Sequence, residues 1–167
     1  QATALGFRRD NVPPRPMASE WNAGEEAHLG AGLWDRGNVL LGVYDAIHRG
    51  DLLPQSRVHV RNRFLSAFDG MPFRVRVDRD ANGEVHREIG RTLRVSELAE
   101  QMIVSSSNLA TNLLFDLVGL ESLQRTLVDL GLGGIDLRRG VEDETAYQHD
   151  INNRVTARGL VGLLRLI

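Results

Sequence analysis

Apolar residues recur with the spacing of a buried helix face in two adjoining segments, 95–105 and 108–118. In both segments they lie at positions i, i+3, i+4 and i+7, which is typical of an amphipathic helix. The break between the segments is polar and ends in the triplet Ser106-Ser107-Asn108. Ser and Asn favour helix starts because their side-chain oxygens accept hydrogen bonds from free backbone N–H groups. The pattern therefore predicts two helices that pack as a bent pair around a polar corner.

Further helices are predicted by the same periodicity and by glycines at helix ends. We expect them at 39–49, ended by Gly50, at 120–130, between Gly119 and Gly131, and from about 155 to the end of the chain. Their apolar faces define an expected core of Leu40, Val43, Ile47, Leu98, Met102, Leu109, Leu113, Leu117, Leu123, Leu127, Leu160 and Leu164.

Apolar and polar residues alternate on either side of an Asn82-Gly83 pair, from Phe73 to Val77 and again from Val85 to Ile89. Asn-Gly supplies the two positive-φ residues of a tight turn, so the stretch predicts a β-hairpin with a structural role.

The turn also matches the opening of an EF-hand calcium loop, with Asp78, Asp80 and Asn82 at alternate positions. The twelfth position of that loop requires an acid, but Ile89 stands there. An ordinary solvated turn is therefore favoured over a calcium site.

Residues 1–38 show no clean period of 2 or 3.6, and prolines and glycines are frequent among them. We expect an irregular segment here, followed by one domain over 39–167. A divergent arm, an upstream region read in another frame, or an assembly of discontinuous pieces would each give such a segment.

Composition excludes several classes of function. The net charge of -2 and the pI near 6.2 give no electrostatic footprint for nucleic acid. The absence of cysteine excludes disulfides and thiol chemistry. The start of the chain lacks the apolar core of a signal peptide, and no apolar run is long enough to span a membrane. The five histidines show no metal-ligand spacing and no nucleotide-binding glycine motif occurs, so we expect no metal and no cofactor. Nothing in the pattern indicates an oligomeric state.

The stretch from Val95 to Gly119 resembles the serine β-lactamase and penicillin-binding family, in which a Ser-x-Asn motif joins two helices beside the nucleophile. The segment 39–54, VLLGVYDAIHRGDLLP, is similar to the family's nucleophile-bearing helix. The segment 139–164 is similar to the loop and following helix of the class A-related branch. The resemblance implies a mainly α chain with one β-hairpin. This would be the helical lobe of a two-lobed α+β fold, without most of the five-stranded sheet.

The same resemblance implies roles for two residues of the polar corner. Ser106 would be a catalytic residue that relays a proton toward the leaving nitrogen, and Asn108 would donate a hydrogen bond to the acyl side chain of the substrate. Both would then bind a small molecule, a β-lactam or a cell-wall peptide, in a secreted or periplasmic protein. The alternative role for both residues is helix capping alone.

All 20 basic residues are arginine, which conflicts with the chemistry of the family. Its nucleophile is the Ser of an S-x-x-K motif, and a K-T-G strand faces the substrate. Counting back from residue 39 places the S-x-x-K positions on 33–36, with Leu33 in place of the nucleophile and Arg36 in place of the base. Arg stays protonated at any working pH and cannot act as a base. The chain also ends before the strands that carry K-T-G, so we expect about two thirds of such a protein, inactive as it stands.

Glu142, Asp143 and Glu144 fall where the resemblance places the loop that flanks the active site. In class A enzymes a Glu of this loop activates the deacylating water, although the E-x-x-x-N spacing is missing here. Glu142 is therefore a weak candidate for a general base, against a solvated loop acid.

Three hypotheses of function remain open. The first is a β-lactamase-type serine hydrolase, and the second is a penicillin-binding-type peptidase or esterase of the same fold. The third is a non-catalytic helical domain that binds a partner or a cell-wall peptide, which the absence of Lys favours.

Overall fold

The computed structural model describes residues 33–81 and 83–166. Seven α-helices, one 3-10 helix and six short strands occur in this part of the chain. Their order is α1 (Leu33–Arg49), β1 (Arg57–His59), β2 (Phe64–Leu65), β3 (Pro72–Phe73), η2 (Val77–Arg79), α2 (Glu84–Arg87), β4 (Thr92–Arg94), α3 (Val95–Val104), α4 (Asn108–Val118), α5 (Leu120–Asp129), β5 (Ile135–Asp136), α6 (Glu144–Gln148), β6 (Arg154–Val155) and α7 (Ala157–Leu164).

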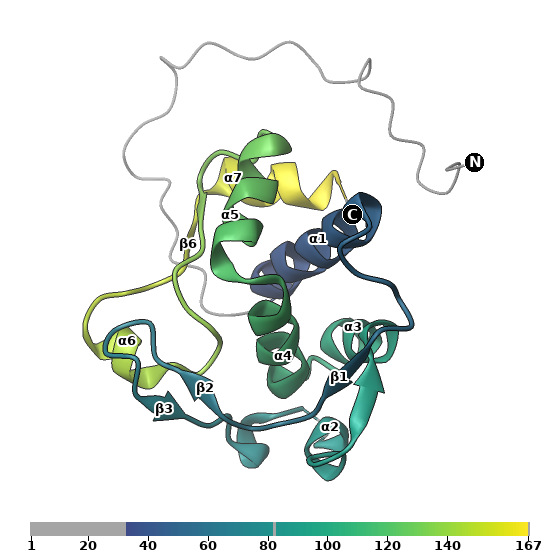
Figure 1. Cartoon of the computed structure of the whole chain (residues 1–167). Coiled ribbons are helices and arrows are strands. Elements are labelled where there is room, and N and C mark those ends of the chain that lie inside the picture. Colours follow the sequence, from purple (N-terminus) through teal and green to yellow (C-terminus); the bar gives the residue numbers. More distant parts are fainter. Residues whose placement is uncertain (1–32, 82, 167) are drawn as a thin grey trace, which may run out of the picture.

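Helix α4 lies at the centre of the described structure and packs against α1, α3 and α5 (Figure 1). Its first turns are buried on every side, from Leu109 to Leu114, because the neighbouring helices surround them. Helices α3 and α4 form the bent pair that the periodicity predicts, so this prediction is confirmed. Helix α1 passes close to α5 at Gly42, where an added Cβ would collide with the side chain of Leu123.

Helix α1 begins at Leu33 rather than at residue 39, so residues 33–38 of the expected irregular segment are helical. Trp34 and Val39 anchor this first part of the helix, being 4% and 2% exposed. Residues 1–32 lie outside the described residues. The predicted helices at 120–130 and near the chain end are confirmed as α5 and α7.

The predicted core is mostly confirmed. Val43, Leu98, Met102, Leu109, Leu113, Leu123 and Leu127 are buried, and Leu40, Ile47 and Leu160 pack against them while partly exposed. Two predictions are wrong, because Leu117 is 38% and Leu164 is 53% exposed. Both lie near the C-terminal ends of their helices, where the apolar stripe is less covered by the other described elements.

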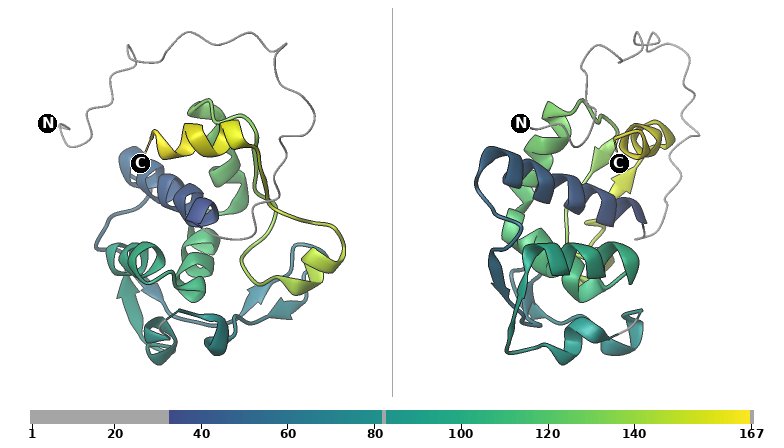
Figure 2. Two further views of the ribbon diagram at one scale, coloured as in Figure 1. Left: turned by 180° about the vertical axis from the view of Figure 1, so that it is seen from behind. Right: turned by 90° about the vertical axis from the view of Figure 1, so that its right-hand side faces the viewer.

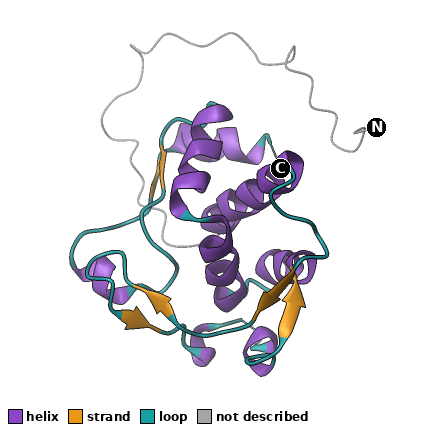
Figure 3. Ribbon diagram, viewed as in Figure 1, coloured by secondary structure: helices purple, strands orange, loops and turns teal. Residues whose placement is uncertain are grey.

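The predicted hairpin over 73–89 is wrong. The strands form three separate antiparallel pairs, β1 with β4, β2 with β3, and β5 with β6 (Figure 3). Phe73 pairs with Phe64 rather than with the later residues of its own stretch. Gly83 has a φ of 63°, but it begins helix α2 instead of closing a hairpin turn. The buried side chains of Val75 and Val85 are anchored in the core, and this anchoring competes with strand pairing.

Two asparagines hold loops that have no strand partner. Asn62 donates from Nδ2 to the Val75 carbonyl and accepts from the Val75 amide through Oδ1, both at 2.8 Å. Asn112 makes the same pair of bonds with Val141, both at 2.7 Å. The primary amide thus replaces a strand neighbour and satisfies backbone groups that burial would otherwise leave unpaired. The Asn112 clamp fixes the loop that precedes α6 to helix α4. Figure 2 shows the ribbon of the described elements from two further sides.

No helix among residues 33–81 and 83–166 is long and apolar enough to cross a membrane.

Candidate active site

The corner between α3 and α4 is built from Ser105, Ser106 and Ser107. Ser105 ends α3, and Ser106 adopts a φ of 54°, in the left-handed region that non-glycine residues rarely occupy. Ser107 precedes the first residue of α4, and its Oγ accepts a hydrogen bond from the Ala110 amide at 3.2 Å. The capping role predicted from the sequence thus belongs to buried Ser107, while the side chain of Ser106 remains exposed.

Asp80 holds this corner from a distant segment of the chain. Its Oδ2 accepts hydrogen bonds from the Ser107 hydroxyl at 3.0 Å and the Leu109 amide at 3.2 Å, and its Oδ1 accepts from the Asn108 amide at 3.2 Å. His86 Nε2 lies 3.2 Å from the same Oδ2. A carboxylate at a helix N-terminus is favourable because it satisfies free N–H groups and faces the positive end of the helix dipole.

The sequence placed Asp80 in a calcium-loop motif, and no pattern in the sequence indicated its role at the corner. The other acid of that motif, Asp78, forms an exposed ion pair with Arg76 instead, and Asn82 lies outside the described residues. Within the described part of the chain, no group of three or more His, Cys, Asp or Glu residues is arranged to hold a metal ion.

Arg36 reaches the corner from helix α1. Its Nη2 donates to the Asn108 Oδ1 at 2.7 Å and to the Ser106 carbonyl at 3.0 Å. Arg36, which the resemblance places where the family has the Lys of S-x-x-K, thus contacts two residues of the Ser-x-Asn triplet. Burial lowers the pKa of Arg36, while the nearby charges of Asp35 and Asp80 raise it. The guanidinium nevertheless remains a cation near neutral pH and can only donate hydrogen bonds.

Glu142 faces Asn108 from the loop before α6. Its Oε1 accepts from Asn108 Nδ2 at 2.8 Å, and its Oε2 accepts from the backbone amide of Arg76 at 3.0 Å. Glu142 has a φ of 61°, and the Asn112 clamp on Val141 holds the preceding residue. The structure therefore brings Glu142 and Asn108 into direct contact, although they are far apart in the sequence.

An open pocket of ≈ 400 Å³ lies over these groups. Asn108 and Glu142 line it together with Arg36, Arg79 and Arg139, and the Arg139 guanidinium lies 5.5 Å from the ring centre of Tyr147. Ser106 makes no side-chain hydrogen bond among the described residues. The site thus offers hydrogen-bond donors and a carboxylate around a cavity, but within residues 33–81 and 83–166 no base hydrogen-bonds to the exposed Ser106 hydroxyl.

Comparisons with known proteins identify the family and the fold of this chain. The family model described as "Beta-lactamase enzyme family" matches residues 38–167. A search of the curated proteins finds no match.

Solved structures of low sequence identity share the fold. A β-lactamase from Xanthomonas campestris is 20% identical with a TM-score of 0.63, and the match covers 84% of this chain and 48% of that chain. A β-lactamase from Sphaerobacter thermophilus is 24% identical with a TM-score of 0.60, covering 82% of this chain and 46% of that one. A variant of PBP-A, solved as an acyl-enzyme complex with penicillin G, is 21% identical with a TM-score of 0.55, covering 78% and 43%.

This chain spans about half the length of these structures. The partial helical fold and the match over residues 38–167 lead to one conclusion: the chain belongs to the β-lactamase enzyme family.

Proposed function

We propose that the pocket at the α3–α4 corner is the substrate-binding site of a β-lactamase-type serine hydrolase, and that this sequence binds its ligand without forming a covalent acyl-enzyme. The ligand would be a β-lactam or a cell-wall peptide, and the protein would act outside the cytoplasm, as expected for the family. The observation that carries the proposal is the position of Arg36, whose guanidinium contacts both Ser106 and Asn108.

Asn108 is the proposed ligand donor. Its Nδ2 donates to Glu142 Oε1 at 2.8 Å and, with a longer bond of 3.3 Å, to the Arg79 carbonyl. An acyl carbonyl would exchange with the weaker of these acceptors. Such an exchange costs little because one hydrogen bond replaces another.

The absence of covalent chemistry follows from the charge at position 36. A serine hydroxyl is almost wholly protonated near neutral pH and needs a base to become a nucleophile. Arg36 holds its proton and contacts the Ser106 backbone carbonyl, and no base among the described residues hydrogen-bonds to the Ser106 hydroxyl. Removing such a partner costs a factor on the order of 10⁴ to 10⁶ in rate.

A slowly deacylating peptidase or esterase of the same fold is the second candidate. It is favoured by Glu142, because both of its oxygens already accept hydrogen bonds, from Asn108 and from the Arg76 amide. A water activated there would have to compete with these donors, which would slow deacylation.

The test is mass spectrometry of the chain after incubation with a labelled penicillin, with a chromogenic cephalosporin as the parallel assay. We expect neither an adduct nor turnover above background with the parent sequence. The double variant Leu33→Ser/Arg36→Lys supplies the missing hydroxyl and amine one helical turn apart, and we expect an adduct that maps to position 33. Leu33→Ser alone is the matched control and should give none. An adduct on Ser105, Ser106 or Ser107 of the parent chain would contradict the proposal.

A further inference from the structure

Three arginines line the pocket, and none of them forms an ion pair with a described carboxylate. Arg36 contacts only uncharged oxygens, those of Ser106 and Asn108, and Arg139 donates to the Gly140 carbonyl at 3.2 Å. No described side chain bonds to the guanidinium of Arg79.

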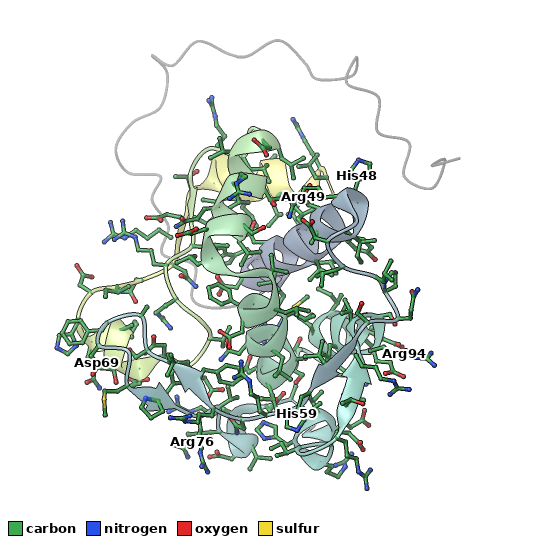
Figure 4. All side chains as sticks on the ribbon, viewed as in Figure 1. His48, Arg49, His59, Asp69, Arg76 and Arg94 are labelled. Carbon is green, nitrogen blue, oxygen red and sulfur yellow. The ribbon has the colours of Figure 1, made fainter. Side chains whose placement is uncertain are left out.

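Six arginines of the described chain do form ion pairs with acids, whereas several exposed ones do not. Arg49 contacts Asp51 at 2.8 Å and Arg61 contacts Asp116 at 2.5 Å. Figure 4 shows that Arg49 and Arg76, which are both paired, lie on different parts of the surface. The contrast is sharpest for two neighbours in sequence, because Arg138 pairs with Asp136 at 2.7 Å while Arg139 turns to the pocket unpaired.

In two of these three arginines, a buried N–H donor of the guanidinium group has no hydrogen-bond acceptor. The Nε atoms of Arg36 and Arg139 are shielded from solvent and make no hydrogen bond. A buried donor that lacks an acceptor loses its hydration without replacement, which is unfavourable, and more so for a charged group. A pocket ligand cannot reach these shielded atoms directly, but charge-assisted bonds to the other N–H groups of the same guanidiniums would offset part of the cost.

The acids of the pocket do not supply that acceptor. Glu142 directs its two oxygens to Asn108 and to the backbone of Arg76, and Glu144 is exposed on α6. Three arginines and two glutamates line the pocket, and the buried carboxylates of Asp35 and Asp80 lie close enough to raise the pKa of Arg36. An anion is therefore favoured by the unpaired guanidinium groups and not by a net positive charge.

We propose that this pocket binds a small oxyanion, a carboxylate or phosphate group, between the guanidinium groups of Arg36 and Arg139. A guanidinium presents its N–H groups as a planar fork that matches two oxygens of such an anion, and these charge-assisted bonds are stronger than neutral ones. The volume of ≈ 400 Å³ leaves room for a ligand that carries the anion as one of its groups. The Asn108 amide would then lie beside the bound anion and contact the rest of the ligand.

The site needs no acyl chemistry. The inference rests on the proposed function in that both concern the same pocket. The anion titration tests non-covalent binding, whereas mass spectrometry tests acylation, so one test can fail while the other succeeds.

The experiment is a titration of the chain with inorganic phosphate and, separately, with acetate, against chloride at matched ionic strength. Binding is followed by the rise in Tm and by the backbone and side-chain amide NMR signals of Asn108. We expect saturable binding of at least one oxyanion. The anion that saturates the site at the lower concentration shows whether the pocket prefers a tetrahedral phosphate or a planar carboxylate.

Arg36→Gln and Arg139→Gln should each weaken the affinity by about tenfold or more, because a hydrogen bond to a charged group contributes roughly that much. Arg125→Gln removes the same charge from the exposed side of α5 and should leave the affinity unchanged. If neither oxyanion exceeds chloride with the parent chain, or if Arg125→Gln weakens binding as much as Arg139→Gln, the proposal is wrong. The Arg139 side chain donates to the neighbouring Gly140 carbonyl and lies over the Tyr147 ring, while the bonds of Arg139 with Asn153 use its backbone, which Arg139→Gln keeps. This variant therefore tests the proposal even if Arg36→Gln fails to fold.

Discussion

At the scale of single residues, a carboxylate from outside the Ser-x-Asn motif determines its shape. Asp80 accepts hydrogen bonds from Ser107, Asn108 and Leu109, with its side chain fully buried. The motif therefore depends on a residue that neither its spacing nor its neighbours indicate. Ser106 projects outward from the same corner in a left-handed conformation, whose cost is offset by the bonds on either side of it.

Replacing this carboxylate tests its importance. Asp80→Asn keeps the shape of the side chain but replaces one accepting oxygen by an NH2 group, which would face the three groups that now donate to Asp80. It also removes the negative charge at the start of α4. We expect a loss of about 1 to 3 kcal/mol in the free energy of unfolding, measured by urea denaturation.

Asp78→Asn is the matched control in the same loop, because the Asp78 side chain is exposed and its ion pair with Arg76 lies on the surface. Exposed pairs contribute little, so no measurable change is expected. Equal effects of the two substitutions would show that Asp80 contributes through general charge rather than through the corner.

At the scale of the elements, helix α4 contains two leucines that the sequence periodicity predicts on the same buried face but that differ in exposure. Leu113 is 2% exposed and lies among the helices, whereas Leu117, one turn later, is 38% exposed. The apolar stripe continues along the helix, but the neighbouring helices cover only its first part.

The two leucines give opposite expectations. Leu113→Ala should cost about 2 to 5 kcal/mol, because it removes buried methyl groups and leaves a cavity. Leu117→Ala should cost no more than roughly 1 kcal/mol, closer to a surface substitution. Urea unfolding of both variants checks the register, and a larger loss at Leu117 would show that α4 is rotated from the orientation described here.

At the scale of the whole molecule, the pocket depends on contacts between segments distant in sequence. Helix α1 contributes Arg36, the α3–α4 corner contributes Asn108, and the loop before α6 contributes Glu142. Asn112 holds that loop to α4 by two bonds to Val141, with Gly140 so close that an added Cβ would lie 2.9 Å from Asn112 Oδ1.

Asn112→Ala should therefore loosen the loop as well as destabilise the fold. It leaves the buried amide and carbonyl of Val141 unpaired, for which we expect a loss of about 2 to 5 kcal/mol. Hydrogen exchange at the Val141 amide should become faster, and exchange in α5 should increase less. Gln148→Ala, on the exposed side of α6, is the control and should change neither. Unchanged exchange at Val141 in Asn112→Ala would mean that other contacts hold the loop.

Some features of this protein were determined by the sequence alone. Helices α3, α4 and α5, the polar corner and most of the core follow from apolar periodicity and end signals, which are local and act within a few residues. The absence of Lys likewise follows from the sequence alone, and the proposal that position 36 cannot supply a base rests on it.

Only the tertiary structure decided the rest. The segment 73–89 alternates like a hairpin, but its residues gain more from burial of Val75 and Val85 and from the contacts of Asp80 than from pairing with each other. The contacts of Arg36 and Glu142 with Asn108 span 72 and 34 positions, and the exposure of Leu117 depends on how far its neighbours extend. The local sequence pattern determines which face of a helix or strand is apolar. Packing between segments distant in sequence determines which residues that face contacts. The pocket arises from this packing, because its residues come from distant segments.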